Sequence, residues 1–440
     1  MFILSGRRPL WLMLIAVGIF SATLIGRLTF GQVSLSAAEP KEAAPISRNT
    51  ADTIADMQDR LRLNPEDTQA YARLGLALLQ RVRETGDAAL YTQADKALSE
   101  ALQRDPKQFE AVIGQGLLTL ARHEFKTALT WGEKARQINP YNIQGYGIIF
   151  DAEIELGRYE AAEATIQKML ATRPELSVYS RLSYLRELQG DRAGAINAMQ
   201  QAVDSGLATA EGTLWSRVQL GHLYFNQGDL AQAEKVYLQT LTFNPDYIYA
   251  FAGLARVRAG QGKHDEAIEY YETIVETLPL PEFVIALADL YEVTGQPAKA
   301  KQQIGLVQAI QQLSSQAGLN VDLELALFNA DHGIEPAQTL RQARAAYAER
   351  PGIYGADTLA WALYQNGEYE EALVYSQDAL RLNTQDALLH FHAGLINRAL
   401  GRTAAAQTHL AQALQINPHF SIRYAPQAQT LLLELQPSDE

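Results

Sequence analysis

The sequence repeats itself with a period near 34 residues, and this period constrains the fold more than any other feature. Residues 357–418 contain two successive copies, which read TLAWALYQNGEYEEALVYSQDALRLN and LHFHAGLINRALGRTAAAQTHLAQALQINP. In each copy apolar residues recur at helical spacing, a glycine ends the first run, and a second run begins soon afterwards. Each copy therefore predicts a helical hairpin. Because one hairpin cannot bury its own apolar face, the copies are expected to stack.

Prolines and glycines set the register of the repeat, and three of the gaps between neighbouring landmark prolines are 34 residues long. The landmark prolines are Pro65, Pro106, Pro140, Pro174, Pro245, Pro279, Pro351 and Pro418. Seven glycines each have an alanine five residues later, and they are Gly157, Gly190, Gly228, Gly262, Gly295, Gly367 and Gly401. A left-handed glycine followed by a small residue suits a turn between two closely crossing helices. The pattern predicts about ten hairpins after residue 50.

Two units depart from this regularity. The first, between Pro65 and Pro106, is 41 residues long, and its extra residues around positions 85–90 are expected to lengthen the turn between its helices. The unit after Gly295 continues to Gly318, which predicts a long or broken second helix and a candidate hinge. The expected organisation is an export segment (1–38), a linker (39–50), an N-terminal array (51–319), a C-terminal array (320–420), and a capping helix with a tail (421–440).

The first 38 residues differ from the rest of the chain. Arg7 and Arg8 precede an apolar run over residues 10–25, and a small, polar stretch follows, which is typical of an export signal. The run is intermediate between a signal-peptide core and a full membrane span. Cleavage after Ala38 and retention as a membrane anchor therefore both stay open, and we favour the anchor. The basic flank predicts that the body of the protein lies outside the cytoplasm, exported and membrane-anchored or released as a periplasmic or secreted protein.

Composition and motifs argue against several classes of function. A formal net charge of −13 disfavours nucleic acid as a partner, and the absence of cysteine excludes disulfides and thiolate zinc sites. The eight histidines include no pair at i, i+4 spacing and no HExxH motif, so no metal site is predicted. The Gly-x-Gly pairs at 114–116 and 145–147 lie inside predicted helices without a following Lys-Ser or Lys-Thr. We therefore predict a protein that is not an enzyme and has no cofactor.

The complete pattern resembles the tetratricopeptide repeat. The residues of units 214–245 and 248–280 that match its motif are Leu220, Gly221, Tyr224, Ala233, Tyr237, Pro245, Phe251, Leu254, Ala255, Ala267, Tyr271 and Pro279. The resemblance implies an all-α fold, an α-solenoid of about ten stacked hairpins with a C-terminal capping helix, preceded by the signal or anchor helix. Residues 322–420 also resemble the C-terminal part of uncharacterised exported bacterial proteins of this kind, which supplies no activity.

The resemblance further implies that the first helix of each unit lines the concave side. The residues at its groove-facing positions include Trp215, His222, Phe225, Tyr249, Arg256, Tyr354, Asp357, Trp361 and Tyr364. An aromatic groove of this kind can hold an extended or helical peptide. The matching sites of the second unit, Ile113, Gly114 and Leu117, lack the basic and amide side chains with which some relatives bind a terminal carboxylate.

Three functions remain open on this evidence. The favoured one is a non-enzymatic scaffold that binds a protein or peptide in the concave groove and reaches the membrane through its N-terminal segment. The second is an accessory subunit of a membrane-bound envelope, secretion or transport complex. The third is a carbohydrate or small-ligand binding module that uses the same aromatic residues.

Overall fold

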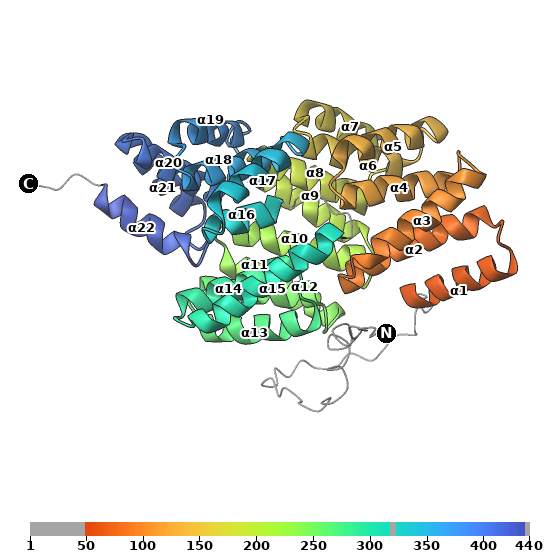
Figure 1. Ribbon diagram of the computed structural model, residues 1–440, viewed down its shortest axis with the longest axis horizontal. Helices are drawn as coiled ribbons and strands as arrows, with labels where there is room; N and C mark the ends of the chain where they lie inside the picture. Colours follow the sequence, from red (N-terminus) through yellow and green to blue (C-terminus); the bar gives the residue numbers. More distant parts are fainter. Residues whose placement is uncertain (1–48, 317–322, 436–440) are drawn as a thin grey trace, which may run out of the picture. The chain divides into compact units, whose positions relative to one another are not determined.

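The computed structural model describes residues 49–316 and 323–435, which contain 22 helices and no strand (Figure 1). Residues 48–440 form one compact unit. The predicted export segment at residues 1–38 lies outside the described residues. Within the described ranges, no helix combines the length and the apolar character needed to span a membrane.

Twenty of these helices pair in chain order into ten hairpins, as the sequence predicted, with one helix before them and one after. The leading helix is α1 (Thr50–Leu63), and the capping helix is α22 (Tyr424–Glu434). The hairpins are α2 (Thr68–Thr85) with α3 (Ala89–Arg104), α4 (Phe109–Ala121) with α5 (Phe125–Ile138), α6 (Ile143–Glu155) with α7 (Tyr159–Thr172), α8 (Leu176–Leu188) with α9 (Arg192–Ser205), α10 (Glu211–Asn226) with α11 (Leu230–Phe243), α12 (Ile248–Gly260) with α13 (His264–Thr277), α14 (Pro281–Val293) with α15 (Pro297–Gln316), α16 (Leu323–Asp331) with α17 (Pro336–Glu349), α18 (Ile353–Gln365) with α19 (Tyr369–Ala379), and α20 (Ala387–Ala399) with α21 (Thr403–Ile416).

Left-handed residues make the turns inside the hairpins. All seven glycines of the repeat pattern have positive φ, between 67° and 81°. The alanine five residues after each glycine is buried, as Ala267 on α13 and Ala372 on α19 illustrate with no exposed surface. Between α4 and α5 the same place is taken by His123, at a φ of 59°. The predicted turn chemistry and the predicted close helix crossings are therefore confirmed.

For the two irregular units, one prediction from the sequence was wrong and the other is confirmed. The extra residues of the first unit lengthen α2 to 18 residues, and the turn before α3 is short, so the expectation of a long turn was wrong. Residues 81–85 continue the helix, where Arg81 and Glu84 form an ion pair with Nη1 and Oε2 3.2 Å apart, and Gly86 ends it in the left-handed conformation. The prediction of a long second helix after Gly295 is confirmed by α15, which has 20 residues.

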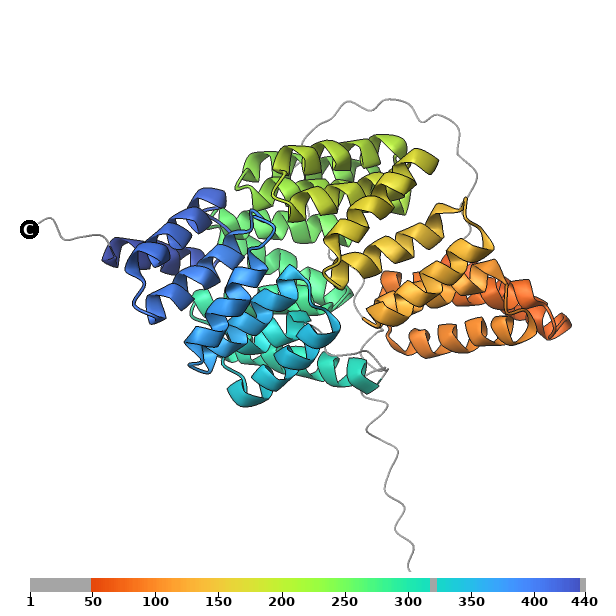
Figure 2. The same ribbon diagram turned by 90° about the horizontal axis from the view of Figure 1, so that it is seen from above.

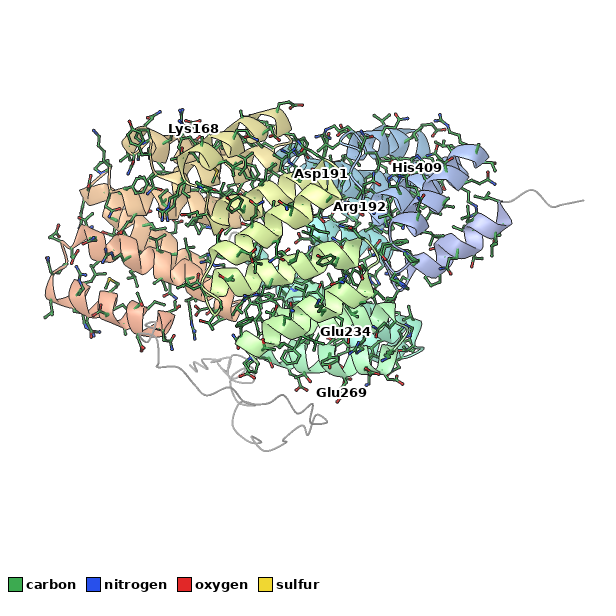
Figure 3. The ribbon with its side chains drawn as sticks, turned by 180° about the vertical axis from the view of Figure 1, so that it is seen from behind. Lys168, Asp191, Arg192, Glu234, Glu269 and His409 are labelled. Atoms are coloured by element: carbon green, nitrogen blue, oxygen red, sulfur yellow. The ribbon has the colours of Figure 1, made fainter. Side chains whose placement is uncertain are left out.

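First and second helices differ in burial. In α18 and α20 most side chains are buried, whereas the second helices bury one face and expose the other. Figure 3 labels charged residues on second helices, among which Lys168 of α7 and Glu269 of α13 are exposed. The second helices thus form the solvated side of each hairpin. The first helices form the side that packs against the neighbouring hairpins.

Hairpins far apart in the sequence touch through their turns. A side chain at Gly157 would come within 2.6 Å of the carbonyl oxygen of Pro351, and one at Gly190 within 2.5 Å of that of Asn383. Gly228 lies in the same way against Pro418. Figures 1 and 2 both show the C-terminal hairpins, drawn in blue, beside the hairpins drawn in yellow and green.

Hydrogen bonds reinforce these turn-to-turn contacts. The backbone N–H of Ile353 donates to the hydroxyl of Tyr159 at 2.9 Å, and the side-chain amide of Asn417 donates to the carbonyl oxygen of Phe225 at 2.9 Å. The hydroxyl of Thr384 donates to the carbonyl oxygen of Leu188. The paired turns are 194, 193 and 190 residues apart for Gly157, Gly190 and Gly228, respectively. Turns that lie between five and six repeats of about 34 residues apart in the sequence are therefore in contact.

Candidate binding site

Three cavities adjoin helix α10, and Trp215 lines all of them. The first, of about 520 Å³, also borders the turn after α2 and the turn before α14. The second, of about 610 Å³, extends along α8, and the third, of about 560 Å³, extends along α12 and α14. The Trp215 side chain is 41% exposed, although most large apolar side chains of the described residues are buried. We call these three spaces the Trp215 cavities.

Helical spacing explains why α10 presents a polar and aromatic face to the cavities. Gln219 and His222 follow Trp215 at intervals of four and three residues, so the three side chains share one face of the helix. Gln219 and His222 both line the second and third cavities. Tyr249 on α12 lines the first and third cavities. Two neighbouring first helices thus supply one continuous set of lining residues.

A buried tyrosine holds His222 in place. The Tyr237 ring fills the space between α10 and α12, where a side chain at Gly221 or Gly253 would come within 2.3 or 2.5 Å of it. Its hydroxyl lies 2.6 Å from His222 Nδ1. Burial, helped by the nearby charge of Arg256, lowers the pKa of His222 to about 3. His222 is therefore a neutral lining group at physiological pH.

Arg256 stands between the second and third cavities and lines both. Its guanidinium lies 4.0 Å from the centre of the Phe225 ring, which is only 2% exposed. Its Nη2 donates to Asn226 Oδ1 at 3.3 Å, and the amide nitrogen of Asn226 donates to Glu187 at 3.2 Å. The ring beneath and the amide beside it fix the guanidinium at the cavity wall.

The structure brings together five of the residues that the tetratricopeptide pattern placed in the groove. All five line the third cavity, and they are Trp215, His222, Phe225, Tyr249 and Arg256. Phe225 contributes mainly as the support of Arg256, because its ring is buried. The sequence reasoning missed Gln219 and Asn226, although helical spacing from Trp215 and His222 could have indicated both. It also missed residues 419–422, which border the third cavity from another part of the chain.

The four C-terminal candidates do not border the Trp215 cavities, which corrects the expectation of one groove along the whole array. Trp361 is 2% exposed, and its indole N–H donates to Asp331 at 2.7 Å. Asp357 is buried beside His392, with 2.9 Å between Oδ2 and Nδ1. Tyr364 stacks on Trp361, and Tyr354 packs against the core formed by α6, α7 and α8.

The capping helix and the next first helix explain this burial. The ring centre of His392, on α20, lies 4.2 Å from that of Trp361, and Tyr424, on α22, lies edge-on at 6.1 Å. These rings cover the face of α18 that the repeat pattern assigns to the groove. Helix α22 comes after the last repeat, so the periodicity carried no information about where it packs.

A second polar cluster joins helices α14, α16 and α22. The ligand-type atoms of Asp289, Glu292 and His332 lie within 4.8 Å of one another, a grouping that could hold a metal ion. The guanidinium of Arg423 lies 3.3 Å from Asp289, 3.6 Å from Glu292 and 3.2 Å from His332 Nε2. Because this guanidinium already supplies a positive charge to both carboxylates, we interpret the cluster as an ion-pair network that holds the capping helix.

The stacked hairpins, with their left-handed turns and buried alanines, define the class of protein as an α-solenoid built from helical repeats. A family model described as "Tetratricopeptide repeat" matches residues 87–143, 218–280 and 358–419. These three regions therefore contain tetratricopeptide repeats, as the sequence pattern indicated. Repeats of this family form scaffolds for protein interactions, and the fold is typically non-enzymatic.

Several solved structures are similar to this chain. They include the APC/C hetero-tetramer Cut9-Hcn1 (17% identity, TM-score 0.39, 84% of this chain and 64% of that chain) and a human IFIT1 dimer with PPP-AAAA (16%, 0.48, 76% and 77%). A thermophilic tetratricopeptide protein of Thermus thermophilus matches over 42% of this chain and 94% of its own, with 22% identity and a TM-score of 0.37. The chain thus spans somewhat less than two thirds of the APC/C protein. A search of curated proteins found no match.

Proposed function

We propose that this protein is a non-enzymatic scaffold that binds a segment of a partner protein in the Trp215 cavities. The observation that carries the proposal is Trp215 itself, a large aromatic side chain that is 41% exposed and lines all three cavities. Exposed aromatic side chains in concave sites commonly anchor peptides, because the ring offers a large contact area at a small cost in conformational entropy.

The dimensions and lining of the cavities support a peptide ligand. Each cavity has a volume within the range of typical ligand pockets, and together they follow four successive first helices, α8, α10, α12 and α14. The walls combine rings, such as Trp215 and Tyr249, with hydrogen-bonding groups, such as Gln219 and Asn226. A peptide needs both kinds of contact, since its side chains require apolar pockets and its backbone requires donors and acceptors.

We further propose that the repeat body acts outside the cytoplasm, tethered by its N-terminal segment. The support for this proposal is the sequence of residues 1–38, with two arginines before an apolar run. If the repeat body acts there, its partner protein is expected in the same compartment.

Site-directed crosslinking in the full chain tests the binding proposal. With the photoreactive residue benzoylphenylalanine in place of Trp215, irradiation of cells that express the chain should give a discrete adduct with a partner protein. The matched control places the same residue at Tyr141, which is 84% exposed and does not line the Trp215 cavities. Adducts of equal yield from both positions, or none from position 215, would contradict the proposal.

A further inference from the structure

Arg256 differs from Arg181, the other arginine that lines the second cavity. Arg181 holds Asp151 through two hydrogen bonds of 2.8 and 2.7 Å. Arg256 has no ion-pair partner among the described residues, and its guanidinium contacts the side-chain amide of Asn226 and the ring of Phe225. The guanidinium is thus partly withdrawn from water without a carboxylate against it.

Four of the acidic side chains that line the second and third cavities have hydrogen-bond or ion-pair partners other than Arg256. Glu155 pairs with Arg350, and Asp289 pairs with Arg423. Asp331 accepts hydrogen bonds from Trp361 and from the hydroxyl of Tyr424, both at 2.7 Å. Glu187 accepts from Asn226, and this amide separates the carboxylate from the Arg256 guanidinium.

The neighbours of Arg256 fit an anionic group that belongs to a larger ligand. His222 is neutral at physiological pH, so it adds no second charge, and Gln219 and Asn226 supply amide groups to the same walls. The exposed Trp215 ring lines the same two cavities. Arg256 is therefore the group of these walls that favours a negatively charged partner, and Trp215, Gln219 and Asn226 offer apolar and neutral polar contacts beside it.

We propose that Arg256 recognises an acidic side chain in the bound partner segment, and that a bulky apolar side chain of the same segment lies against Trp215. This inference rests on the proposed function, because it names the chemistry of the segment that the Trp215 cavities take. The planar guanidinium is held from below by Phe225, so it can offer two N–H groups side by side to a carboxylate.

Peptide selection on the full chain tests this inference. A library of random dodecapeptides, displayed on phage with both peptide ends linked to other residues, is selected against the wild type and against Arg256→Gln. The wild type should enrich peptides with Asp or Glu at one position near an aromatic or large aliphatic residue. Arg256→Gln should lose the acidic preference and keep the apolar one. A selected acidic peptide, made synthetically with blocked ends, should bind about 10- to 100-fold more weakly to Arg256→Gln.

A neighbouring arginine provides the matched control. Arg258 is on the same helix and pairs with Glu234 and Glu266, and it does not line the three cavities. Arg258→Gln should therefore select the same acidic peptides as the wild type, and circular dichroism should show equal helical content in both variants. Peptides enriched only for apolar residues, or an acidic preference that survives in Arg256→Gln, would overturn the inference and leave peptide binding intact. Failure to enrich any peptide, together with no adduct at position 215, would overturn the proposed function.

Discussion

At the scale of single residues, the protein has polar side chains that line the Trp215 cavities and a second polar group that is fully buried. Asp357 and His392 form the buried pair, in contact with the Trp361 ring. Burial opposes the charge on His392, but Asp357, Asp331 and Asp386 together outweigh burial and raise the pKa of His392. Burial also raises the pKa of Asp331 and of Asp386. In the folded state all three groups therefore hold their protons to higher pH than they do in the unfolded chain.

This raised pKa fixes the sign of a pH effect. The stabilisation from His392 is complete below its unfolded pKa of about 6.5 and is lost as the pH rises through the higher folded value. Other buried histidines, such as His222, have lowered pKa values and act in the opposite direction, so the effect of His392 is measured as a difference between two proteins. Asp357→Asn should have a lower urea-unfolding midpoint than the wild type at pH 6, because it leaves a buried imidazole without its partner. The gap between the two midpoints should narrow as the pH rises through the folded pKa of His392. A variant that keeps the full pH dependence would show that another group causes it.

At the scale of helices, small residues set how closely the two helices of a hairpin approach. Ala267 and Ala372 have no exposed surface. We expect Ala267→Leu and Ala372→Leu each to lower the free energy of unfolding by about 1–3 kcal/mol, because the larger side chain overpacks the crossing. Urea denaturation followed by circular dichroism measures the change. Ala231→Leu, at an exposed position of α11, is the control and should have little effect. Unchanged stability in both buried variants would contradict the assigned register.

The helices also show how far sequence reasoning reaches. Turn glycines, buried alanines and the number of hairpins followed from local chemistry, since each feature depends on residues a few positions apart. Five residues that line the third cavity followed from the resemblance to the tetratricopeptide repeat, because α10 and α12 are ordinary first helices. Trp361 occupies an equivalent position, but its surroundings depend on α22, which packs there outside any repeat. No local pattern in the sequence reports that contact.

The same limit applies to the cavities. Residues 419–422 border the third cavity together with Trp215, although about 200 residues separate the two in the chain. Their proximity depends on where the array meets itself, and that position is the cumulative result of many small rotations between repeats. The period of the sequence repeat does not determine the size or direction of the rotation between neighbouring repeats. The sequence therefore predicted the face of the site but not its opposite wall.

At the scale of the whole molecule, the compartment is the property to test. A reporter that is active only outside the cytoplasm, fused after Glu440, should be active if residues 1–38 direct export. The same reporter fused to a chain that lacks residues 1–38 is the control and should be inactive. Activity restricted to a cytoplasmic reporter would refute the proposed location. N-terminal sequencing of the mature protein that begins at Glu39 would show cleavage rather than an anchor.

The turn-to-turn contacts also limit how this gene could change in length. A simple solenoid can gain or lose a unit by duplication or deletion, because each unit touches only its neighbours. Here the turns at Gly157, Gly190 and Gly228 each meet a partner some 190 residues later. Loss of one unit between Gly228 and Pro351, the interval common to all three pairs, would present each of these turns with the wrong partner. We therefore expect units to be gained or lost more readily near the ends of the array than inside that interval.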